Sequence, residues 1–326
     1  PPLESKSVIN WVYLLLVVIV FRLSTSLHQV PSQALLPELA EDDNEYVKLS
    51  TWDATFLLIG MMWGGMAGIF IERNGFQVMS FIYIISALVI FYAPFLVLRE
   101  KHIASNTSRI SFRESLMLTL RNRNFIHFVV IWVLYLVAAN FVQSSVPYIV
   151  TEVCLLNTAG TTYYFYIPGV IASLLAYPLV GKLAKKWSKR KVFSTSLLAS
   201  ACIFPGTLFI GPWLPIPLSI QCSGWAILQS VAMAGVVVLT NAFAAEIAEG
   251  DKTHREGMYF ASMKVLDQIF LGLAAILLPL VLSLGRSHLS PQGAIGVRLT
   301  GLIGGLLMLV GYLIFLGYPR FDTYTS

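Results

Sequence analysis

Charged side chains are scarce in this sequence, and their scarcity excludes an ordinary soluble domain. Only 12% of the residues are charged and 56% are hydrophobic, whereas a soluble domain carries roughly 25% charged residues. Because a core grows more slowly than the surface around it, a soluble fold of 326 residues cannot bury so much apolar side chain. We therefore expect lipid to be the solvent for most of the chain.

Residue types that carry catalysis or bind metals are also few. The three cysteines, Cys154, Cys202 and Cys222, lie in apolar surroundings, which predicts small core residues and neither a disulfide framework nor a metal cluster. The five histidines show no H-E-x-x-H spacing, and no glycine-rich phosphate loop is present. Because no nucleophile–base pair or metal-ligand set stands out, we expect neither an enzyme nor a metal site.

Long apolar runs, by contrast, are abundant. A bilayer core of about 30 Å needs roughly 20 apolar residues in a helix, and in lipid the backbone groups of a spanning segment must pair within that segment. The sequence predicts an all-α fold, a polytopic bundle of transmembrane helices, with nine runs at 9–30, 52–71, 77–98, 125–149, 161–184, 192–211, 216–245, 258–284 and 293–317.

Lysine and arginine between these runs fall mainly on one side. If alternate loops share a side, 16 of these residues lie on one side and 4 on the other. The positive-inside rule then places the C-terminus in the cytoplasm and the first residue outside. The net charge of +5 is therefore an orientation signal. Since the basic residues are spread over several loops, we expect the lipid bilayer as a partner and no nucleic acid.

A short acidic motif occurs twice. The loop after the first run, 38–43, reads Glu-Leu-Ala-Glu-Asp-Asp, and the loop after the seventh run, 246–251, reads Glu-Ile-Ala-Glu-Gly-Asp, at an offset of 208 residues. A period of six helices is typical of two parallel six-helix repeats, as in the major facilitator superfamily. The first run then corresponds to a fourth helix, so nine of twelve helices are expected here and three upstream. The chain also opens without a methionine.

The predicted domains follow from this repeat. Residues 1–98 are expected to form the remainder of an N-terminal bundle (helices 4–6), 99–124 a cytoplasmic linker, and 125–326 a C-terminal six-helix bundle (helices 7–12). Within the linker, the segment that begins at Ser111 has amphipathic spacing and can lie on the membrane surface.

Segments 30–43 and 255–260 together resemble the glycoside–pentoside–hexuronide cation symporter family, the melibiose-permease-like branch of the major facilitators. Lysophospholipid symporters are similar in the same places. Residues 181–191 resemble the superfamily's loop between helices 8 and 9, with Lys185 where an acid is usual. The resemblance runs from about 9 to 320 and implies alternating access around a substrate site between two bundles.

Three positions depart from the sugar-transporting members of this family. Gln29 stands where an Asp used for cation coupling is common, Asp53 where an Arg is usual, and Gln268 where some members carry a Lys. These departures weigh against a sugar-and-sodium assignment in particular. They do not weigh against a transporter.

Polar side chains inside the runs are functional candidates, because lipid makes them costly. We expect Arg22 either to contact the substrate or coupling ion or to form a structural salt bridge. We expect His28 either to take part in proton coupling or to have a packing role. Lys264 and Asp267 share one helix face and can pair, as a gating or coupling element or as a self-compensating pair. With the amides that the superfamily analogy adds, the candidates are Arg22, His28, Gln29, Asn140, Gln143, Gln229, Lys264, Asp267 and Gln268.

Other features suggest a gate, a stacking surface and a packing stripe. The two acidic loops are expected to bind basic residues or helix N-termini when a cytoplasmic gate shuts, with candidates Glu38, Glu41, Asp43, Glu246, Glu249, Asp251 and Arg255. Three tyrosines are expected either to stack on a sugar ring or to anchor the protein at the membrane interface: Tyr163, Tyr164 and Tyr166. Gly60, Gly64 and Gly68 recur every fourth residue, which predicts close helix approach.

We therefore expect a monomeric, multi-pass protein of the cell membrane that acts as a secondary active transporter. The first candidate is a symporter of a sugar, glycoside or similar small solute, with Na⁺ or H⁺ as coupling ion and no other cofactor. Two alternatives remain: a transporter of lysolipids or other amphiphiles with the same fold, and a non-transporting membrane protein such as an assembly factor or a receptor.

Overall fold

The computed structural model describes residues 8–34, 43–65, 67–97, 117, 119, 121–156, 160–249, 256–284 and 295–317. Every element within these ranges is a helix, so the all-α prediction is confirmed. The nine predicted runs each overlap a long helix: α1 (Val8–Ala34), α3 (Asp43–Gly65), α4 (Ala67–Val97), α6 (Arg123–Tyr148), α7 (Ile167–Trp187), α8 (Lys189–Ile203), α9 (Leu218–Glu249), α10 (Glu256–Ser283) and α11 (Ile295–Leu316).

Three short irregular helices extend these elements. The π-helix η1 (Ile149–Val153) continues α6, the π-helix η2 (Thr161–Tyr166) leads into α7, and the 3₁₀ helix η3 (Phe204–Leu208) continues α8. The segment that begins at Ser111, predicted to lie on the membrane surface, falls outside the described residues except for Met117 and Thr119.

Seven helices in the described ranges are long and apolar enough to cross a membrane, at Asn74–Tyr92, Arg123–Val153, Thr161–Trp187, Lys189–Leu208, Leu218–Ile247, Met258–Ser283 and Ile295–Leu316. The two other predicted spans, 9–30 and 52–71, are also helical. In α1 the apolar stretch is the shorter Leu15–Thr25, and α3 includes Lys48 and Asp53 among several polar residues.

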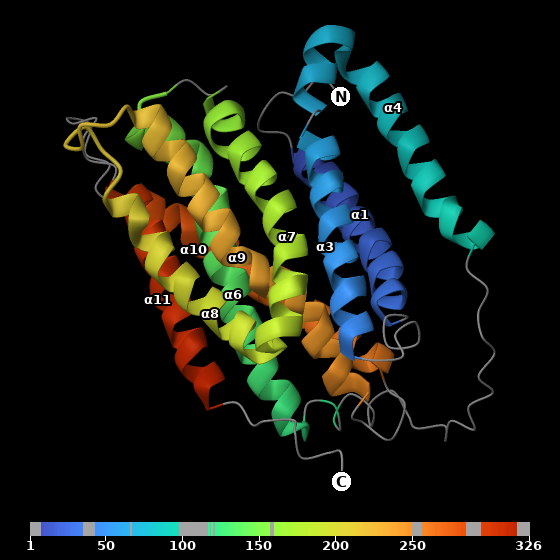
Figure 1. The fold of residues 1–326 in the computed structure, drawn as a ribbon. Helices are drawn as coiled ribbons and strands as arrows, with labels where there is room; N and C mark the ends of the chain where they lie inside the picture. Colours follow the sequence, from blue (N-terminus) through green and yellow to red (C-terminus); the bar gives the residue numbers. More distant parts are fainter. Residues whose placement is uncertain are drawn as a thin grey trace, which may run out of the picture.

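The break predicted between the runs 52–71 and 77–98 is found at Gly75, where two helices join across a kink within α4. Helix α3 ends at Gly65, and α4 starts at Ala67 and continues through the polar segment with one kink at Gly75, where φ is +80°. Only glycine adopts this backbone conformation without a steric cost. Figure 1 shows α4 standing apart from the other helices, and its span Asn74–Tyr92 is 0% buried.

The core lies among the helices that follow residue 123. Helix α11 packs against α6, α8 and η3, and α9 packs against α7 and α8. Phe243 and Phe315 enclose Phe193, with ring centroids 5.1 and 4.9 Å from its own. The N-terminus of α6 is capped by Asn122, whose Oδ1 accepts from the backbone N–H groups of Asn124 and Phe125.

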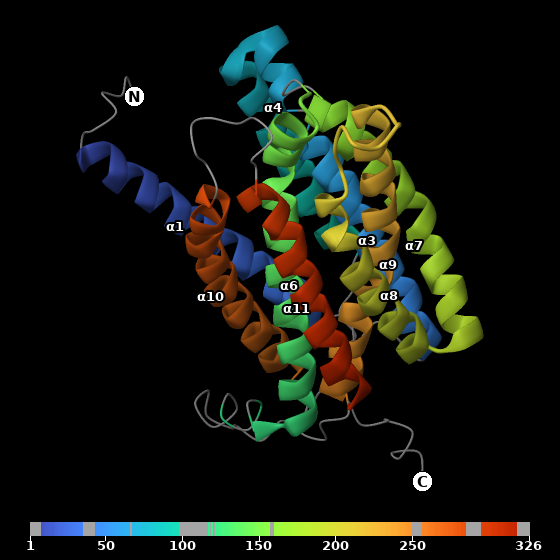
Figure 2. The ribbon, with the colours of Figure 1, turned by 90° about the vertical axis from the view of Figure 1, so that its left-hand side faces the viewer.

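The helices before residue 98 meet this core at three places. Helix α3 packs against α7 and α9, whereas α1 packs against α10. Figure 2 shows α1 crossing α10 obliquely, with its N-terminal end projecting away from the bundle. These junctions bring residues far apart in the sequence together, and they position the polar groups of the candidate site.

Two packing expectations were wrong. A Cβ added at Gly60 or Gly64 would meet nothing within 4 Å, so these glycines do not mark a close helix approach; the surroundings of Gly68 lie outside the described side chains. Close approach occurs instead on α11, where a Cβ at Gly304 would lie 3.0 Å from Val142 Cγ2. Cys202, expected in the core, is exposed, because it lies on an outward face of α8 where lipid can solvate it.

Candidate functional site

The clearest polar cluster inside the helices is centred on α10. Lys264 Nζ lies 3.6 Å from Asp267 Oδ2, and this is the pair that their spacing predicted. The other oxygen, Asp267 Oδ1, accepts a hydrogen bond of 2.7 Å from Trp132 Nε1 on α6. The Asp267 side chain is only 7% exposed, so its charge depends on these partners because water cannot stabilise it.

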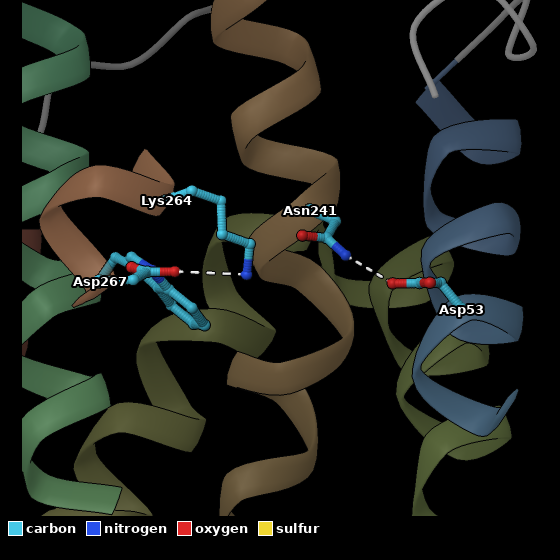
Figure 3. Close-up of polar contacts among 5 residues, drawn as sticks. Asp53, Asn241, Lys264 and Asp267 are labelled. Atoms are coloured by element: carbon cyan, nitrogen blue, oxygen red, sulfur yellow. Dashed lines mark hydrogen bonds and ion pairs between the residues drawn. The ribbon is translucent and has the colours of Figure 1, made fainter. Parts of the chain in front are cut away.

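A second polar contact joins α3 to α9. Asn241 Nδ2 donates to Asp53 Oδ2 over 2.7 Å, across 188 positions of sequence. Asp53 is exposed and Asn241 is half-buried. The charge of Lys264 also acts on Asp53, and Figure 3 shows the lysine side chain extending from the Asp267 side toward Asn241. One ammonium group therefore lies within electrostatic reach of two carboxylates.

This five-residue group, Asp53, Trp132, Asn241, Lys264 and Asp267, is called here the junction network, and it draws on four helices. Asp53 was noted from the sequence only as a departure from the family pattern. Trp132 and Asn241 were not predicted at all. Nothing in the sequence marks them, because their partners come from helices whose relative register is set only by packing.

The amide candidates fall into two groups. Gln229 on α9 is 1% exposed; its Nε2 donates to Met233 Sδ over 3.7 Å, and its Oε1 has no hydrogen-bond partner among the described residues. Asn140 is half-buried, while Gln143 and Gln268 are exposed. None of these four amides has a contact here that joins it to the junction network.

Aromatic rings border the network. Trp132 stacks on Tyr135 with ring centroids 5.2 Å apart and an interplanar angle of 28°. By contrast, Tyr163, Tyr164 and Tyr166 belong to η2 and their side chains are exposed. Helix η2 leads into the first turn of α7, whereas Lys185 and Lys186 lie in its last turn. Tyrosines at a helix end commonly anchor a protein at the membrane interface.

Several predicted residues lie outside what the structure describes. Arg22, His28 and Gln29 belong to α1, which packs against α10, but their side chains are not among those described. The same holds for the side chains of Asp43, at the start of α3, and Glu249, at the end of α9. Four gate candidates fall outside the described residues altogether: Glu38, Glu41, Asp251 and Arg255.

Glu246 is the gate candidate whose surroundings are described. Its Oε2 accepts from Lys189 Nζ over 2.7 Å. Lys189 is the first residue of α8 and follows Ser188, whose φ of +88° turns the chain sharply after α7. Glu246 thus pairs with a basic residue at a helix N-terminus, but it lies within α9 and not in the loop that the sequence predicted at 246–251. The two partners, however, belong to adjoining helices α8 and α9, both after residue 123, so this contact does not cross the junction with α1 and α3.

The fold and this network together define a polytopic helical membrane protein with paired charges at the junction of its early and late helices. A family model described as MFS/sugar transport protein matches residues 1–319. The chain belongs to this family of major facilitator transporters. No curated protein sequence matches the chain.

Proposed function

We propose that this protein is a secondary active transporter that couples the movement of a small solute, first of all a sugar or glycoside, to a cation. The observation that carries the proposal is the junction network, which places two carboxylates and an ammonium group between α3 and the later helices. Charged side chains within a membrane are costly, and they commonly mark the pathway of an ion or substrate.

The charges of the network support a coupling role. Asp53 and Asp267 are negative and Lys264 is positive, so these three side chains carry one net negative charge when all are ionised. A proton or Na⁺ bound there would cancel that charge. Asp53 is exposed and Asp267 is buried, so an ion arriving from water reaches Asp53 first.

The helix contacts support two bundles that rock about this site. With 1–98 and 125–326 as sister units, α1 corresponds to α9 and α3 to α10. Helix α1 packs against α10, and its counterpart α9 packs against α3. This exchange of partners is what a parallel duplication produces, and relative movement of the two units changes both contacts together.

The orientation of the protein is part of the proposal. Lys182, Lys185, Lys186, Lys189, Arg190 and Lys191 cluster where α7 ends and α8 begins. This basic end faces the cytoplasm by the positive-inside rule. The helix order then brings the C-terminal end of α11 to the same side (Figure 1).

A sugar is favoured as solute by the groups beside the network. Trp132 is half-buried and stacks on the buried Tyr135, so its ring brings apolar surface next to the Asp267 carboxylate. A ligand site typically combines an apolar lining with a few polar groups that fix orientation. The network would supply the polar groups and α6 the rings.

Uptake by cells that express the protein tests this function. We expect labelled sugar or glycoside to accumulate and the accumulation to collapse with a protonophore or a Na⁺ ionophore. Asp267→Asn should lower uptake about tenfold or more while insertion is kept, since unpairing a buried charge costs about 3–5 kcal/mol. Arg22→Ala should lower uptake to a similar extent, because a charged residue within a membrane-spanning helix commonly serves transport. Lys182→Gln, at an exposed position on α7, is the matched control.

Three results would contradict parts of the proposal. Uptake that survives both substitutions would remove the site assignment. Uptake of a lysophospholipid in place of every sugar tested would replace the solute class. No ionophore-sensitive uptake of any solute in either panel would favour a non-transporting role.

A further inference from the structure

The connection between α8 and α9 is short and carries no charge. Residues 209–217, called here the α8–α9 loop, link the spans Lys189–Leu208 and Leu218–Ile247 and read Phe-Ile-Gly-Pro-Trp-Leu-Pro-Ile-Pro. No charged residue occurs anywhere from 192 to 245. The turn at the other end of α8 differs, because it is rich in lysine.

Large apolar side chains of the α8–α9 loop are exposed. Phe209 and Trp213 are 68% and 60% exposed, and Ile216 is exposed as well. The Trp213 ring lies against Arg298 of α11, whose guanidinium carbon is 4.7 Å from the ring centroid. Apolar side chains gathered on a surface mark contact with a membrane or with another protein. The loop therefore offers a surface that the rest of the chain does not cover.

Arg298 binds the backbone where η3 ends and the loop begins. Its Nη1 donates to the carbonyl oxygens of Thr207 (3.1 Å), Leu208 (3.2 Å) and Ile210 (2.6 Å). Thr207 Oγ1 in turn donates to the carbonyl oxygen of Arg298 over 2.9 Å. One side chain of α11 thus satisfies three carbonyl groups of this connection.

Two further side chains bind the backbone of the loop itself. Trp213 Nε1 donates to the Phe209 carbonyl oxygen over 3.0 Å. Gln221 Nε2, from the start of α9, donates to the carbonyl oxygens of Gly211 (3.1 Å) and Ile216 (2.6 Å). Its Oε1 accepts from Gly211 N over 3.0 Å. These bonds hold the loop in one shape from both ends.

Every carbonyl group from residue 207 to residue 211 therefore has a side-chain donor. A carbonyl group that faces bulk water needs no such partner because water hydrates it, whereas one that lies in lipid without a donor is costly. Pro212, Pro215 and Pro217 act in the same direction, because proline has no backbone N–H to satisfy. The backbone of the loop is thus suited to a place where water is scarce.

We propose that the α8–α9 loop lies in the bilayer interface, with Phe209, Trp213 and Ile216 in contact with lipid at the boundary between headgroups and acyl chains. Tryptophan is enriched at this level of a membrane. Figure 1 shows the loop, in yellow, at the end of the helices opposite the turn between α7 and α8. The proposed orientation makes this the outer leaflet, but the contact with lipid does not depend on the side. At this shallow depth the loop stays within reach of small reagents in the water.

Lipid fits this surface better than a second protein does. A protein interface typically surrounds its apolar centre with a polar rim, and the α8–α9 loop has no polar side chain from residue 209 to residue 217. The loop also continues directly from two membrane spans. Its neighbours on both sides are therefore already in the bilayer.

The depth of a spin label on the loop tests the proposal. In a Cys202→Ser background, Phe209→Cys carries a nitroxide, and the full chain is placed in phosphatidylcholine vesicles. Relaxation of the label by oxygen, which concentrates in lipid, and by a water-soluble nickel complex reports its depth. We expect oxygen to dominate at position 209, at about 5 Å below the headgroups. Ile216→Cys gives a second reading with the same expectation.

Lys185→Cys, at an exposed position of the basic end, is the matched control, and there the nickel complex should dominate. The Cys202→Ser chain without an added cysteine should take up little label, since Cys154 and Cys222 are buried. Dominance of the nickel complex at 209 and 216 would overturn the proposal, because the loop would then lie in water. Low access to both reagents, with spectral broadening from a second label, would overturn it in favour of a second copy of the chain.

Gln221→Glu tests how the loop is held. This change keeps the oxygen that accepts from Gly211 N but removes the amide donor to the carbonyl groups of Gly211 and Ile216. The label at 209 should become more mobile, and its ratio of oxygen to nickel access should fall several-fold. Gln77→Glu, at an exposed position of α4, should change neither.

Equal effects of these two changes would overturn the role of Gln221, while the labels in the chain with Gln221 intact still decide the contact with lipid. No readout requires a transported solute. Failure here is therefore distinguishable from failure of the proposed transport function.

Discussion

Asp267 illustrates how a buried charge is held in this protein. Its two oxygens have separate partners on different helices, Lys264 on α10 and Trp132 on α6. A carboxylate removed from water needs both its counter-ion and hydrogen bonds to remain ionised at low cost. The indole N–H is therefore a functional group of the site and contributes more than apolar bulk.

Trp132→Phe tests that role. The substitution keeps a ring beside Tyr135 but removes the only hydrogen-bond donor of the indole, which leaves Asp267 Oδ1 without its 2.7 Å bond. We expect stability to fall by about 1–3 kcal/mol, with reduced uptake, in measurements of thermal unfolding and transport. Trp187→Phe, at a 50% exposed position on α7, should change neither. Equal effects of the two substitutions would contradict the assignment.

Asp53 and Asn241 allow the junction itself to be probed by a double-mutant cycle. Asp53→Ala and Asn241→Ala should each destabilise the protein, and together by less than their sum, with a coupling of about 0.5–3 kcal/mol. The physical reason is the shared 2.7 Å hydrogen bond between α3 and α9. Thermal unfolding of the four proteins gives the coupling. Strict additivity would show that the contact does not join the helices energetically.

At the scale of residues, prediction from sequence succeeded where both partners lie on one helix. Lys264 and Asp267 are three positions apart, and helix geometry alone brings them together. Asp53, Asn241 and Trp132 meet through α3, α9 and α6, and their distances depend on the register of packed helices. No spacing rule reports that register, so the network was visible from the sequence only in part.

At the scale of elements, small residues on α11 decide how closely helices approach. A Cβ at Gly305 would lie 2.5 Å from Pro205 Cγ and 2.9 Å from the Ala201 carbonyl oxygen, whereas one at Gly60 would meet nothing within 4 Å. Where two backbones come this close, an added side chain destabilises the protein most, because packed interiors have little free volume.

Gly305→Ala should therefore destabilise the protein by about 1–3 kcal/mol through overpacking. Gly60→Ala should be neutral or stabilise it by up to about 1 kcal/mol, because alanine has the higher helix propensity. Thermal unfolding in detergent measures both. The reverse order of effects would mean that the contact surfaces of α3 and α11 are assigned wrongly.

The existence of the nine long helices was predictable because lipid imposes both their length and their internal hydrogen bonding. Their ends were less so. The polar residues 72–75 predicted a break, which the structure has as a kink at Gly75 within α4, whereas the end of α3 at Gly65 falls inside the predicted run 52–71. The glycine stripe of α3 gave a wrong packing prediction because a small-residue repeat does not reveal whether a partner helix is there.

At the scale of the whole molecule, the proposed orientation can be measured by labelling. In a Cys202→Ser background, Leu214→Cys introduces a thiol before α9 and Lys185→Cys introduces one at the basic end; both positions are exposed. A membrane-impermeant maleimide should label the first variant in intact cells and the second only after permeabilisation. The opposite pattern would reverse the orientation, and labelling of both in intact cells would contradict the spanning fold.

The exchanged contacts, α1 with α10 and α9 with α3, have a mechanical consequence. In the proposed arrangement of two units, 1–98 and 125–326, these two contacts form two seams between the units, and a rotation of one unit strains both seams together. A cross-link placed across either seam alone should then arrest the whole movement, and the untouched seam should stop moving with it.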